Sequence, residues 1–350
     1  MATVLVTGGA GYIGSHTMVE LLAAGHDVVC VDNLSNSSAE AVRRVAQIAG
    51  REPAFHEVDL RDAPALRQVL ESYPIDAVIH FAALKAVGES VARPLAYYDN
   101  NVHGTLELLA AMQRASVHRI VFSSSATVYG DPAHTPIAEA LGTGNPVNPY
   151  GRSKLMIEEM LKDLALSDTR WSIALLRYFN PIGAHESGLI GEDPHGRPSN
   201  LLPCLTQVAI GRLPELTVFG NDYPTVDGTC VRDYIHVVDV AEGHLKALQM
   251  LQHSPGTHIW NLGTGTGYSV LQIIHSFEDV TGVSIPYHFA PRRAGDIAQC
   301  WADPSKAGRD LGWYAQRNLE QMIIDTWRWQ SSNPYGYQFP LPLPVTVAVK

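Results

Sequence analysis

Tyr150 and Lys154 are four residues apart in a stretch with helical spacing, which places both side chains on one helix face. A free tyrosine has a pKa near ~10 and is a poor base at neutral pH. A neighbouring ammonium, helped by an oxidised nicotinamide, stabilises the phenolate and lowers that pKa. The pair therefore predicts a tyrosine that exchanges protons with a substrate. The alternative is an ordinary surface Tyr–Lys pair.

Three serines, Ser123, Ser124 and Ser125, end the strand that precedes this helix. Side chains alternate along a strand, so Ser123 and Ser125 share one face and Ser124 lies on the other. One of these hydroxyls is suited to hydrogen-bond a reacting substrate oxygen. The serines also fit a role in satisfying the backbone at an irregular strand end, and the pattern alone does not choose among them.

A glycine loop follows the first strand and opens the first helix, with Gly8, Gly11 and Gly14 in the spacing G-x-x-G-x-x-G. Glycines there allow a tight turn, close approach to a pyrophosphate and close helix–strand packing. Asp32 ends the second strand, near the ~20-residue offset expected for an acid that binds ribose hydroxyls. No arginine follows until Arg43, so NAD is favoured over NADP. The alternatives are a structural turn for the glycines and a helix cap or turn acid for Asp32.

These residues need a scaffold of strands that alternate with helices, and the first half of the chain shows that pattern. Such alternation is typical of a parallel, doubly wound α/β sheet of the Rossmann type. The expected strands are Thr3–Thr7, Val28–Val31, Ala54–Val58, Ala77–Ala82, Ile120–Ser124 and Ile173–Tyr178. The expected helices are Ile13–Ala24, Ala63–Glu71, Thr105–Ala115 and Met156–Leu166, and Asn148-Pro149 is typical of a helix start.

We expect two domains. Residues 1–182 form the NAD-binding Rossmann domain, and the chain returns to it at about 229–265 through a helix at Val237–Leu251 and a strand at His258–Leu262. Residues 183–350 mainly form a smaller α/β domain that binds substrate. Clusters of Gly, Pro, Asn and Asp predict loops from Gly183 to Gly228. The tail, residues 336–350, has no assigned role.

The chain has 350 residues, 46% of them hydrophobic, and a formal net charge of −10. The negative charge argues against nucleic-acid or anionic-membrane partners. The four cysteines show no C-x-x-C pair, which predicts reduced thiols in a cytoplasmic protein and no metal site. We find no signal peptide, and no apolar run approaches the ~20 residues of a membrane span.

Longer blocks extend these motifs: Phe81–Ser90, Tyr97–Asn101, Ser123–Gly130, Arg177–Pro181 and Val231–His236. With the glycine loop, Asp32 and the Tyr150/Lys154 pair, they make the chain resemble the extended short-chain dehydrogenase/reductases, and among these the UDP-galactose (UDP-glucose) 4-epimerases. The resemblance covers about residues 3 to 335. Ala83 stands where many relatives have glycine, a small change.

The resemblance implies an isomerase that interconverts UDP-galactose and UDP-glucose through a 4-keto intermediate, with bound NAD. Tyr150 would take the proton of the sugar 4-hydroxyl, and Ser125 matches the family's catalytic serine. Lys154 would bind the nicotinamide ribose and keep Tyr150 acidic. A homodimer through helices near 100–115 and 150–166 is also implied.

The resemblance also implies the contacts of both ligands. The residues that match cofactor contacts are Gly8, Gly11, Tyr12, Ile13, Gly14, Asp32, Asn33, Leu34, Ser35, Asn36, Ser37, Asp59, Leu60, Phe81, Ala82, Ala83, Lys85, Asn100, Ser123, Tyr150, Lys154 and Phe179. Those that match the UDP-hexose contacts are Lys85, Ser125, Tyr150, Asn180, Asn200, Leu201, Thr217, Val218, Phe219, Arg232, Arg293, Asp296 and Cys300. Two arginines would supply charge for the diphosphate in an otherwise acidic protein. Arg293 also fits an ordinary surface arginine.

Cys300 bears on substrate breadth. Family members confined to the non-acetylated sugars tend to carry Tyr at the matching position, whereas members that accept 2-acetamido sugars carry a small residue. The resemblance thus implies activity on UDP-N-acetylglucosamine and UDP-N-acetylgalactosamine as well, because an N-acetyl arm needs space that a phenol ring would fill. The alternative is that Cys300 is a small buried hydrophobe chosen for packing.

Two other functions compete on the same fold. A nucleotide-sugar 4,6-dehydratase usually carries Asp-Glu beside the catalytic serine, whereas Ser125 is followed here by Ala126, Thr127 and Val128. A non-catalytic NAD-sensing protein typically loses the tyrosine or the lysine, and this chain keeps both Tyr150 and Lys154. Both alternatives are disfavoured.

Overall fold

The largest element of the computed structural model, which describes residues 1–196, 198–293 and 295–338, is a parallel sheet of seven strands. Its members are β1 (Thr3–Thr7), β2 (Asp27–Asp32), β3 (Ala54–Glu57), β4 (Ala77–His80), β5 (Arg119–Ser125), β6 (Ser172–Tyr178) and β10 (Gly256–Leu262). They lie in the order β10-β6-β5-β4-β1-β2-β3. The direction of winding reverses between β1 and β4, and ligands bind at such a switch point, beyond the carboxyl ends of the strands.

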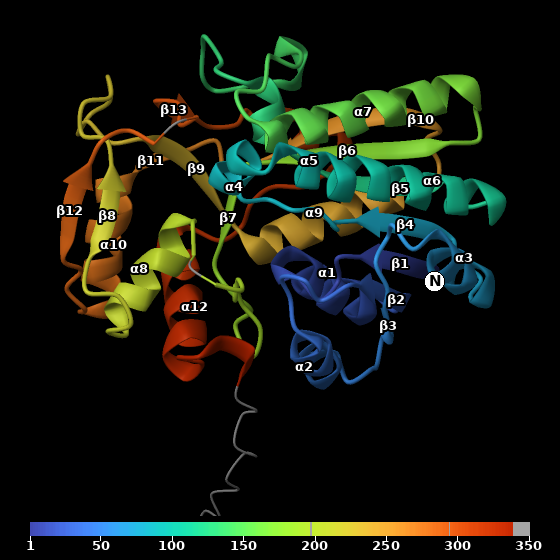
Figure 1. The fold of residues 1–350 in the computed structure, drawn as a ribbon, viewed down its shortest axis with the longest axis horizontal. Coiled ribbons are helices and arrows are strands. Elements are labelled where there is room, and N and C mark those ends of the chain that lie inside the picture. The colour runs from blue at the N-terminus through green and yellow to red at the C-terminus, as the bar shows by residue number, and fades with distance from the viewer. Residues whose placement is uncertain (197, 294, 339–350) are drawn as a thin grey trace, which may run out of the picture.

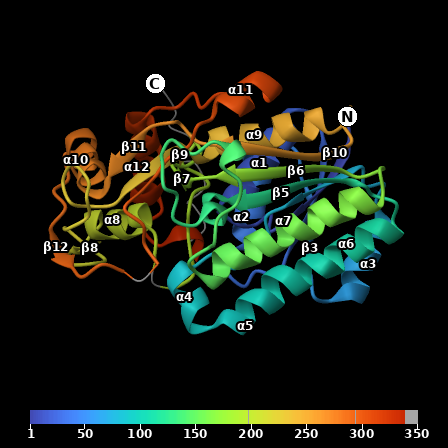
Figure 2. The same ribbon diagram turned by 90° about the horizontal axis from the view of Figure 1, so that it is seen from above.

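Helices cover both faces of this sheet (Figures 1 and 2). On one side are α1 (Tyr12–Ala23), α2 (Ala39–Ala49), α9 (Val237–Met250) and α11 (Ser305–Leu311); on the other are α3 (Ala63–Ser72), α6 (Gly104–Arg114) and α7 (Pro149–Ser167). The alternation along β1 explains the two layers: Val4 and Val6 share a core with Met18 of α1, whereas Leu5 packs into a second core with Leu108 of α6. The predicted doubly wound α/β fold is confirmed.

A smaller α/β region lies beside the carboxyl ends of the large sheet (Figure 1). A second sheet contains β7 (Asn180–Ile182), β9 (Val231–His236), β11 (Gly267–Ser269) and β13 (Gln299–Cys300), and β8 (Leu216–Phe219) pairs with β12 (Tyr287–Ala290). The helices here are α8 (Leu201–Ala209), α10 (Val270–Thr281) and α12 (Leu319–Ser332). Leu205, Val218, Phe277 and Ile323 meet in its core.

Short elements connect these parts. After β4 come α4 (Val87–Ala92), α5 (Pro94–Tyr97) and a π-helical turn, Tyr98–His103, that runs into α6. The remaining 3-10 turns are Ala126–Tyr129, Glu139–Leu141 and Gly336–Gln338. Both the π-helical turn and Ala126–Tyr129 pack against α7, and Ala126–Tyr129 directly follows β5.

The structure corrects the prediction of loops from Gly183 to Gly228, because α8 and β8 lie in that range. Leu202, Leu205 and Val208 have helical spacing, and Pro203 is tolerated since it stands in the first turn of α8. The helix α2 was also not expected. The domain boundary at residue 182 stays a prediction: β10 pairs with β6 in the large sheet, but β9 lies in the smaller one. Residues 339–350 of the tail lie outside the described residues.

Candidate active site

Helix α7 begins where the sequence predicts. The side-chain oxygen of Asn148 accepts a hydrogen bond from the backbone N–H of Gly151 at 2.9 Å, and Pro149 occupies the first helical position. This cap places Tyr150 in the first turn and Lys154 one turn later, both buried beside the carboxyl end of β5. The alternative of a surface Tyr–Lys pair is therefore wrong.

Burial sets the electrostatics of this pair. The ammonium of Lys154 donates to the backbone carbonyl of Ser123 at 2.7 Å and lies 4.8 Å from the centroid of the Phe122 ring. Burial lowers the pKa of Lys154 to about 7, and the carboxylate of Glu158 opposes that shift. Burial raises the pKa of Tyr150, while a hydrogen bond with Ser125 lowers it. Among the groups of the protein, desolvation outweighs the hydrogen bond with Ser125. The expected lowering of the Tyr150 pKa, which also involves an oxidised nicotinamide, stays a prediction.

The three serines have different partners. The hydroxyl of Ser123 hydrogen-bonds that of Tyr178, and the hydroxyl of Ser124 donates to Glu158 at 2.6 Å. Ser125 meets Tyr150, and its oxygen accepts from the Thr127 hydroxyl at 2.9 Å. Ser125 is the serine that contacts the predicted acid/base, a distinction that the alternation of side chains could not supply.

The backbone of the glycine loop lies so close to neighbouring main-chain atoms that Gly8 and Gly14 have no space for a side chain. A Cβ at Gly8, which has φ +69°, would lie 2.6 Å from the backbone nitrogen of Ala82, and one at Gly14 would lie 2.3 Å from the carbonyl oxygen of Gly8. Gly11 is the N-cap of α1 and makes no side-chain capping bond, so backbone N–H groups face outward at the positive end of the helix dipole. A pyrophosphate fits this arrangement of donors.

Asp32 is the last residue of β2 and lies beside the glycine loop. Its carboxylate accepts from the N–H of Ala10 at 3.0 Å, from the N–H of Leu34 at 2.9 Å and from the hydroxyl of Ser37 at 2.8 Å. Asp32 therefore fills its alternative role of an acid that stabilises a turn. Its binding of ribose hydroxyls stays a prediction. Asn33, the next residue, donates to Asp59 at 2.8 Å, so these predicted cofactor contacts form one connected rim.

Sequence reasoning missed Asn101. It is fully buried; its amide oxygen accepts from the N–H of Leu84 at 2.8 Å, and its amide nitrogen donates to Ser153 of α7 at 3.0 Å. The neighbouring Asn100, a predicted cofactor contact, donates to Asn101 at 3.0 Å. Asn101 thus ties the loop before Lys85 to α7. The sequence signal that could have identified Asn101 was its place in the block Tyr97–Asn101.

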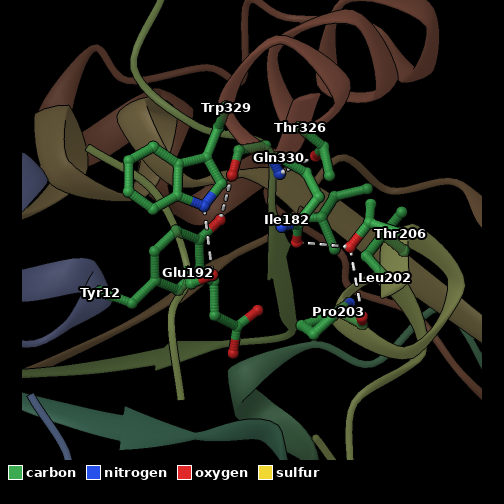
Figure 3. A pocket seen from close by; sticks show the side chains of 10 residues that line it. Tyr12, Ile182, Glu192, Leu202, Pro203, Thr206, Thr326, Trp329 and Gln330 are labelled. Carbon is green, nitrogen blue, oxygen red and sulfur yellow. Dashed lines mark hydrogen bonds between the residues drawn. The ribbon is translucent and has the colours of Figure 1, made fainter. Parts of the chain in front are cut away.

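Two predicted contacts, Lys85 after β4 and Asn200 before α8, meet on one carboxylate. The ammonium of Lys85 and the amide nitrogen of Asn200 both reach the same oxygen of Glu192, at 2.7 and 3.2 Å. Figure 3 shows Glu192 beside Tyr12 and Trp329, next to a cavity of about 10 Å³, the space of a single water. The hydroxyl of Tyr12 donates to the carbonyl of Gly183 at 2.7 Å, which joins the glycine loop to the smaller region.

The other predicted substrate contacts lie on the strands and loops of the smaller region. Arg293 forms two hydrogen bonds with Asp296, at 3.0 and 3.1 Å, and its guanidinium lies 5.7 Å from the centroid of the Phe219 ring. Thr217 faces His288, but the side chain of Val218 points into the core, so only its backbone is accessible to a ligand.

Cys300 lies near the serine run. It is the register partner of Arg232 on β9, and it packs in a small apolar cluster with Ala126 and Phe179. Burial raises the pKa of the Cys300 thiol to about 11, against a smaller opposite effect of Arg232. The structure therefore brings Cys300 next to the segment that follows Ser125.

Other kinds of site are not found in the described part of the chain. No group of three or more His, Cys, Asp or Glu side chains there is arranged to hold a metal ion. Within residues 1–196, 198–293 and 295–338, no helix is long and apolar enough to cross a membrane.

Comparison with known families decides among the possibilities left by this geometry. Residues 4–263 match the family described as the NAD dependent epimerase/dehydratase family. The chain belongs to this family. Family membership, together with the individual relatives described next, confirms the predicted NAD cofactor, the predicted enzyme class and the resemblance found in the sequence motifs.

Individual members of the family are similar over nearly their whole length. The UDP-glucose 4-epimerase of Bacillus subtilis is 62% identical over 335 residues, which cover 96% of this chain and 98% of the relative. The crystal structure of UDP-glucose 4-epimerase from Bifidobacterium longum in complex with NAD+ and UDP has a TM-score of 0.94 and 54% identity, covering 95% and 99% of the two chains. The UDP-Glc/GlcNAc 4-epimerase of Campylobacter jejuni has a TM-score of 0.82 and 37% identity, covering 95% and 99%.

Proposed function

We propose that this protein catalyses the reversible inversion of the 4-hydroxyl that interconverts UDP-galactose and UDP-glucose. The observation that carries the proposal is the buried pairing of Tyr150 with Ser125 beside Lys154, at the carboxyl end of β5. The relatives named UDP-glucose 4-epimerase, at 56–62% identity, support the same reaction. The reaction requires one group that takes a proton from the 4-hydroxyl and returns it, which is the role of Tyr150.

Different residues of the chain have separate roles in this reaction. Ser125 hydrogen-bonds the sugar oxygen next to Tyr150, and Lys154 holds the nicotinamide ribose and supplies positive charge beside the phenol. Bound NAD would supply reversible hydride transfer at C4, with no net redox change over the whole reaction. Arg232 and Arg293 supply positive charge for the diphosphate in a chain whose formal net charge is −10.

The 4,6-dehydratase alternative is disfavoured by the residues that follow Ser125. Ala126 and Val128 are buried, and the hydroxyl of Thr127 donates to Ser125 at 2.9 Å. No carboxyl group occupies these three positions, so the segment lacks the acid/base pair that eliminates water. A non-catalytic sensor is disfavoured by the buried, hydrogen-bonded state of Tyr150 and Lys154.

Product analysis tests the proposal directly. Purified protein is incubated with UDP-galactose and the nucleotide sugars are separated by anion-exchange chromatography. An epimerase forms UDP-glucose with NAD that stays bound through purification and is not consumed. A 4-keto-6-deoxy sugar would indicate a dehydratase, no product would indicate a sensor, and accumulation of NADH in step with product would contradict the epimerase mechanism.

We extend the proposal to UDP-N-acetylglucosamine and UDP-N-acetylgalactosamine. Cys300 supports it, because it offers a small side chain beside Ala126 and Phe179, next to the catalytic serine. The Campylobacter jejuni relative, whose name includes both UDP-Glc and UDP-GlcNAc, adds support. We include three earlier predictions in this proposal. They are the substrate contacts, the domain boundary at residue 182, and the catalytic roles of Tyr150, Lys154 and Ser125.

We also propose a homodimer. Exposed apolar side chains gather on α4 to α7, which lie together on one side of the molecule (Figure 2). They are Val91, Leu95, Leu106, Met156 and Leu166. Such a patch is typical of an interface, and light scattering after size exclusion should give twice the chain mass. A cytoplasmic location stays a prediction from the spacing of the cysteines, which shows no C-x-x-C pair.

A further inference from the structure

A buried ion pair joins α7 to the central sheet directly behind the serine run. The guanidinium of Arg177 on β6 reaches the carboxylate of Glu158 at 2.5 and 2.9 Å, and the two side chains are 2% and 0% exposed. Taking two charges out of water is costly, so a buried pair is weak evidence for a stabilising role. Its position requires another explanation.

The same carboxylate also holds β5. The hydroxyl of Ser124 donates to the Glu158 oxygen that accepts from the Nε of Arg177, at 2.6 Å. Ser124 and Arg177 are direct partners in the register of β5 and β6. One carboxylate on α7 therefore binds two neighbouring strands at a single rung, which fixes both the rotation of the helix and its position along the sheet.

Helical spacing places Tyr150 and Lys154 on the same face of α7 as Glu158. Tyr150, Lys154 and Glu158 are four residues apart, so they share the inward face of α7. Each contacts the end of β5: Tyr150 meets Ser125, Lys154 donates to the carbonyl of Ser123, and Glu158 holds Ser124 between them. A shift of α7 by one residue would move these side chains by about 1.5 Å along the helix axis and turn them away from the strand.

Glu158 also faces Lys154 with a negative charge. The ionisable groups around the catalytic face come from several elements. They are Tyr150 and Glu158 on α7, His80 on β4, Tyr97 on α5, Tyr129 in the turn after β5, and Arg177 and Tyr178 on β6. Glu158 opposes the effect of burial, which lowers the pKa of Lys154 to about 7. Loss of the carboxylate therefore lowers the pKa of Lys154 further and moves the loss of its charge to lower pH.

We propose that Glu158, held by Arg177, is a positioning residue that locks α7 against β5 so that Tyr150 stays paired with Ser125 and Lys154 keeps an anionic neighbour. The inference rests on the proposed epimerase function, because it assigns the role of Tyr150 and Lys154 from that reaction. Glu158 itself touches neither substrate nor cofactor.

The test compares Glu158→Gln with Glu159→Gln. Glutamine keeps the shape and removes the charge. Glu159 is the neighbouring residue on the exposed side of α7, where its side chain is 57% exposed and pairs with Lys162. The wild type and both variants are assayed with UDP-galactose for kcat, KM and the pH profile of kcat, and by hydrogen exchange over residues 149–158. Because Glu158→Gln leaves Arg177 buried without its partner, the double variant Glu158→Gln/Arg177→Gln is read by the same criteria if the single variant does not fold.

We expect Glu158→Gln to lower kcat at least tenfold while KM changes less than threefold, because the substrate contacts lie elsewhere. The alkaline limb of the kcat profile should move down by about one pH unit, and exchange around Tyr150 should rise. Glu159→Gln should match the wild type. A folded Glu158 variant that melts earlier but keeps the wild-type kcat, alkaline limb and exchange would overturn the proposal. A wild type without epimerase activity would refute the proposed function instead, and the exchange comparison would still decide whether Glu158 positions α7.

Discussion

The hydroxyl groups of Tyr150 and Ser125 lie together in a nearly dry environment, with each residue less than a tenth exposed. In such surroundings an unneutralised phenolate is costly, which is why burial raises the pKa of Tyr150. The same low dielectric strengthens the effect of any positive charge brought beside the ring. A tyrosine in this setting keeps its proton until a cationic group is close, which suits a reaction that must return the proton to the sugar.

The role of Tyr150 is tested by Tyr150→Phe, which removes the hydroxyl and keeps the ring. We expect kcat for UDP-galactose to fall by at least ~10²-fold, because a positioned acid/base is lost, with unchanged thermal unfolding. Tyr314→Phe is the matched control, since Tyr314 is 59% exposed. Near-normal activity of a folded Tyr150→Phe protein would refute the mechanism.

Substrate breadth is tested at Cys300, which packs against Ala126 and Phe179. Cys300→Tyr adds a ring to this small cluster, and overpacking typically costs ~1–3 kcal/mol. We expect selective loss of activity on UDP-N-acetylglucosamine, measured as kcat/KM on both substrate pairs, with activity on UDP-galactose retained. A wild type inert toward UDP-N-acetylglucosamine ends the hypothesis, and equal loss on both pairs assigns Cys300 to packing alone.

Among the elements, the junction of β1 with α1 leaves little space for side chains at its glycines. Its glycines let the loop approach Ala82 on one side and leave the N-terminal N–H groups of α1 open on the other. We expect a dinucleotide to bind there only if the backbone keeps this conformation, because main-chain N–H groups rather than side chains would contact the phosphates.

This constraint predicts that Gly14→Ala abolishes NAD binding. The new Cβ would lie 2.3 Å from the carbonyl oxygen of Gly8, so the loop must shift. Gly88→Ala on α4 is the matched control, because its Cβ would meet nothing within 4 Å. The amount of NAD released on denaturation of purified protein measures the effect. Retention of a full equivalent of NAD by Gly14→Ala would contradict the assigned role of the loop.

At the scale of the whole molecule, burial strongly lowers the pKa of three of the five buried histidines in the described part of the chain. Burial lowers the pKa of His16 and His80 to about 3 and that of His244 to about 4. Nδ1 of His244 donates to the carbonyl of Val240, and its Nε2 has no hydrogen-bond partner among the described residues. A proton placed on that nitrogen would be buried without an acceptor.

These shifts predict acid sensitivity. The unfolded chain takes up protons near pH 6.5, whereas the folded protein does so only near pH 3 to 4. The stabilisation is therefore complete above pH 6.5 and is lost as the pH falls toward 4. His244 alone should cost about 2 kcal/mol of unfolding free energy between pH 7 and pH 5. Denaturant unfolding at both pH values should show a smaller loss for His244→Phe than for the exposed control His253→Gln; equal losses would contradict the prediction.

Local sequence determined the strands of the large sheet, the start of α7 and the placement of Tyr150 and Lys154 on one helix face. Asn148 and Pro149 mark the helix start because capping uses groups within three residues, and the spacing of Tyr150 and Lys154 places both on one face for the same local reason. The positions of the glycine loop and Asp32 could also be predicted from the sequence, since a turn and a strand end depend on neighbouring residues. These features follow from short-range stereochemistry.

Tertiary structure alone decided the partners of the serines, the pKa of Tyr150 and the place of Glu158. Ser123, Ser124 and Ser125 are alike in sequence, and only the packing of α7 and β6 on β5 gives each a different contact. The helix α8 was hidden for a related reason, because its apolar positions became informative only once the core they bury was known. Burial and long-range pairing depend on which elements meet, and desolvation at those contacts outweighs the local charges that a sequence displays.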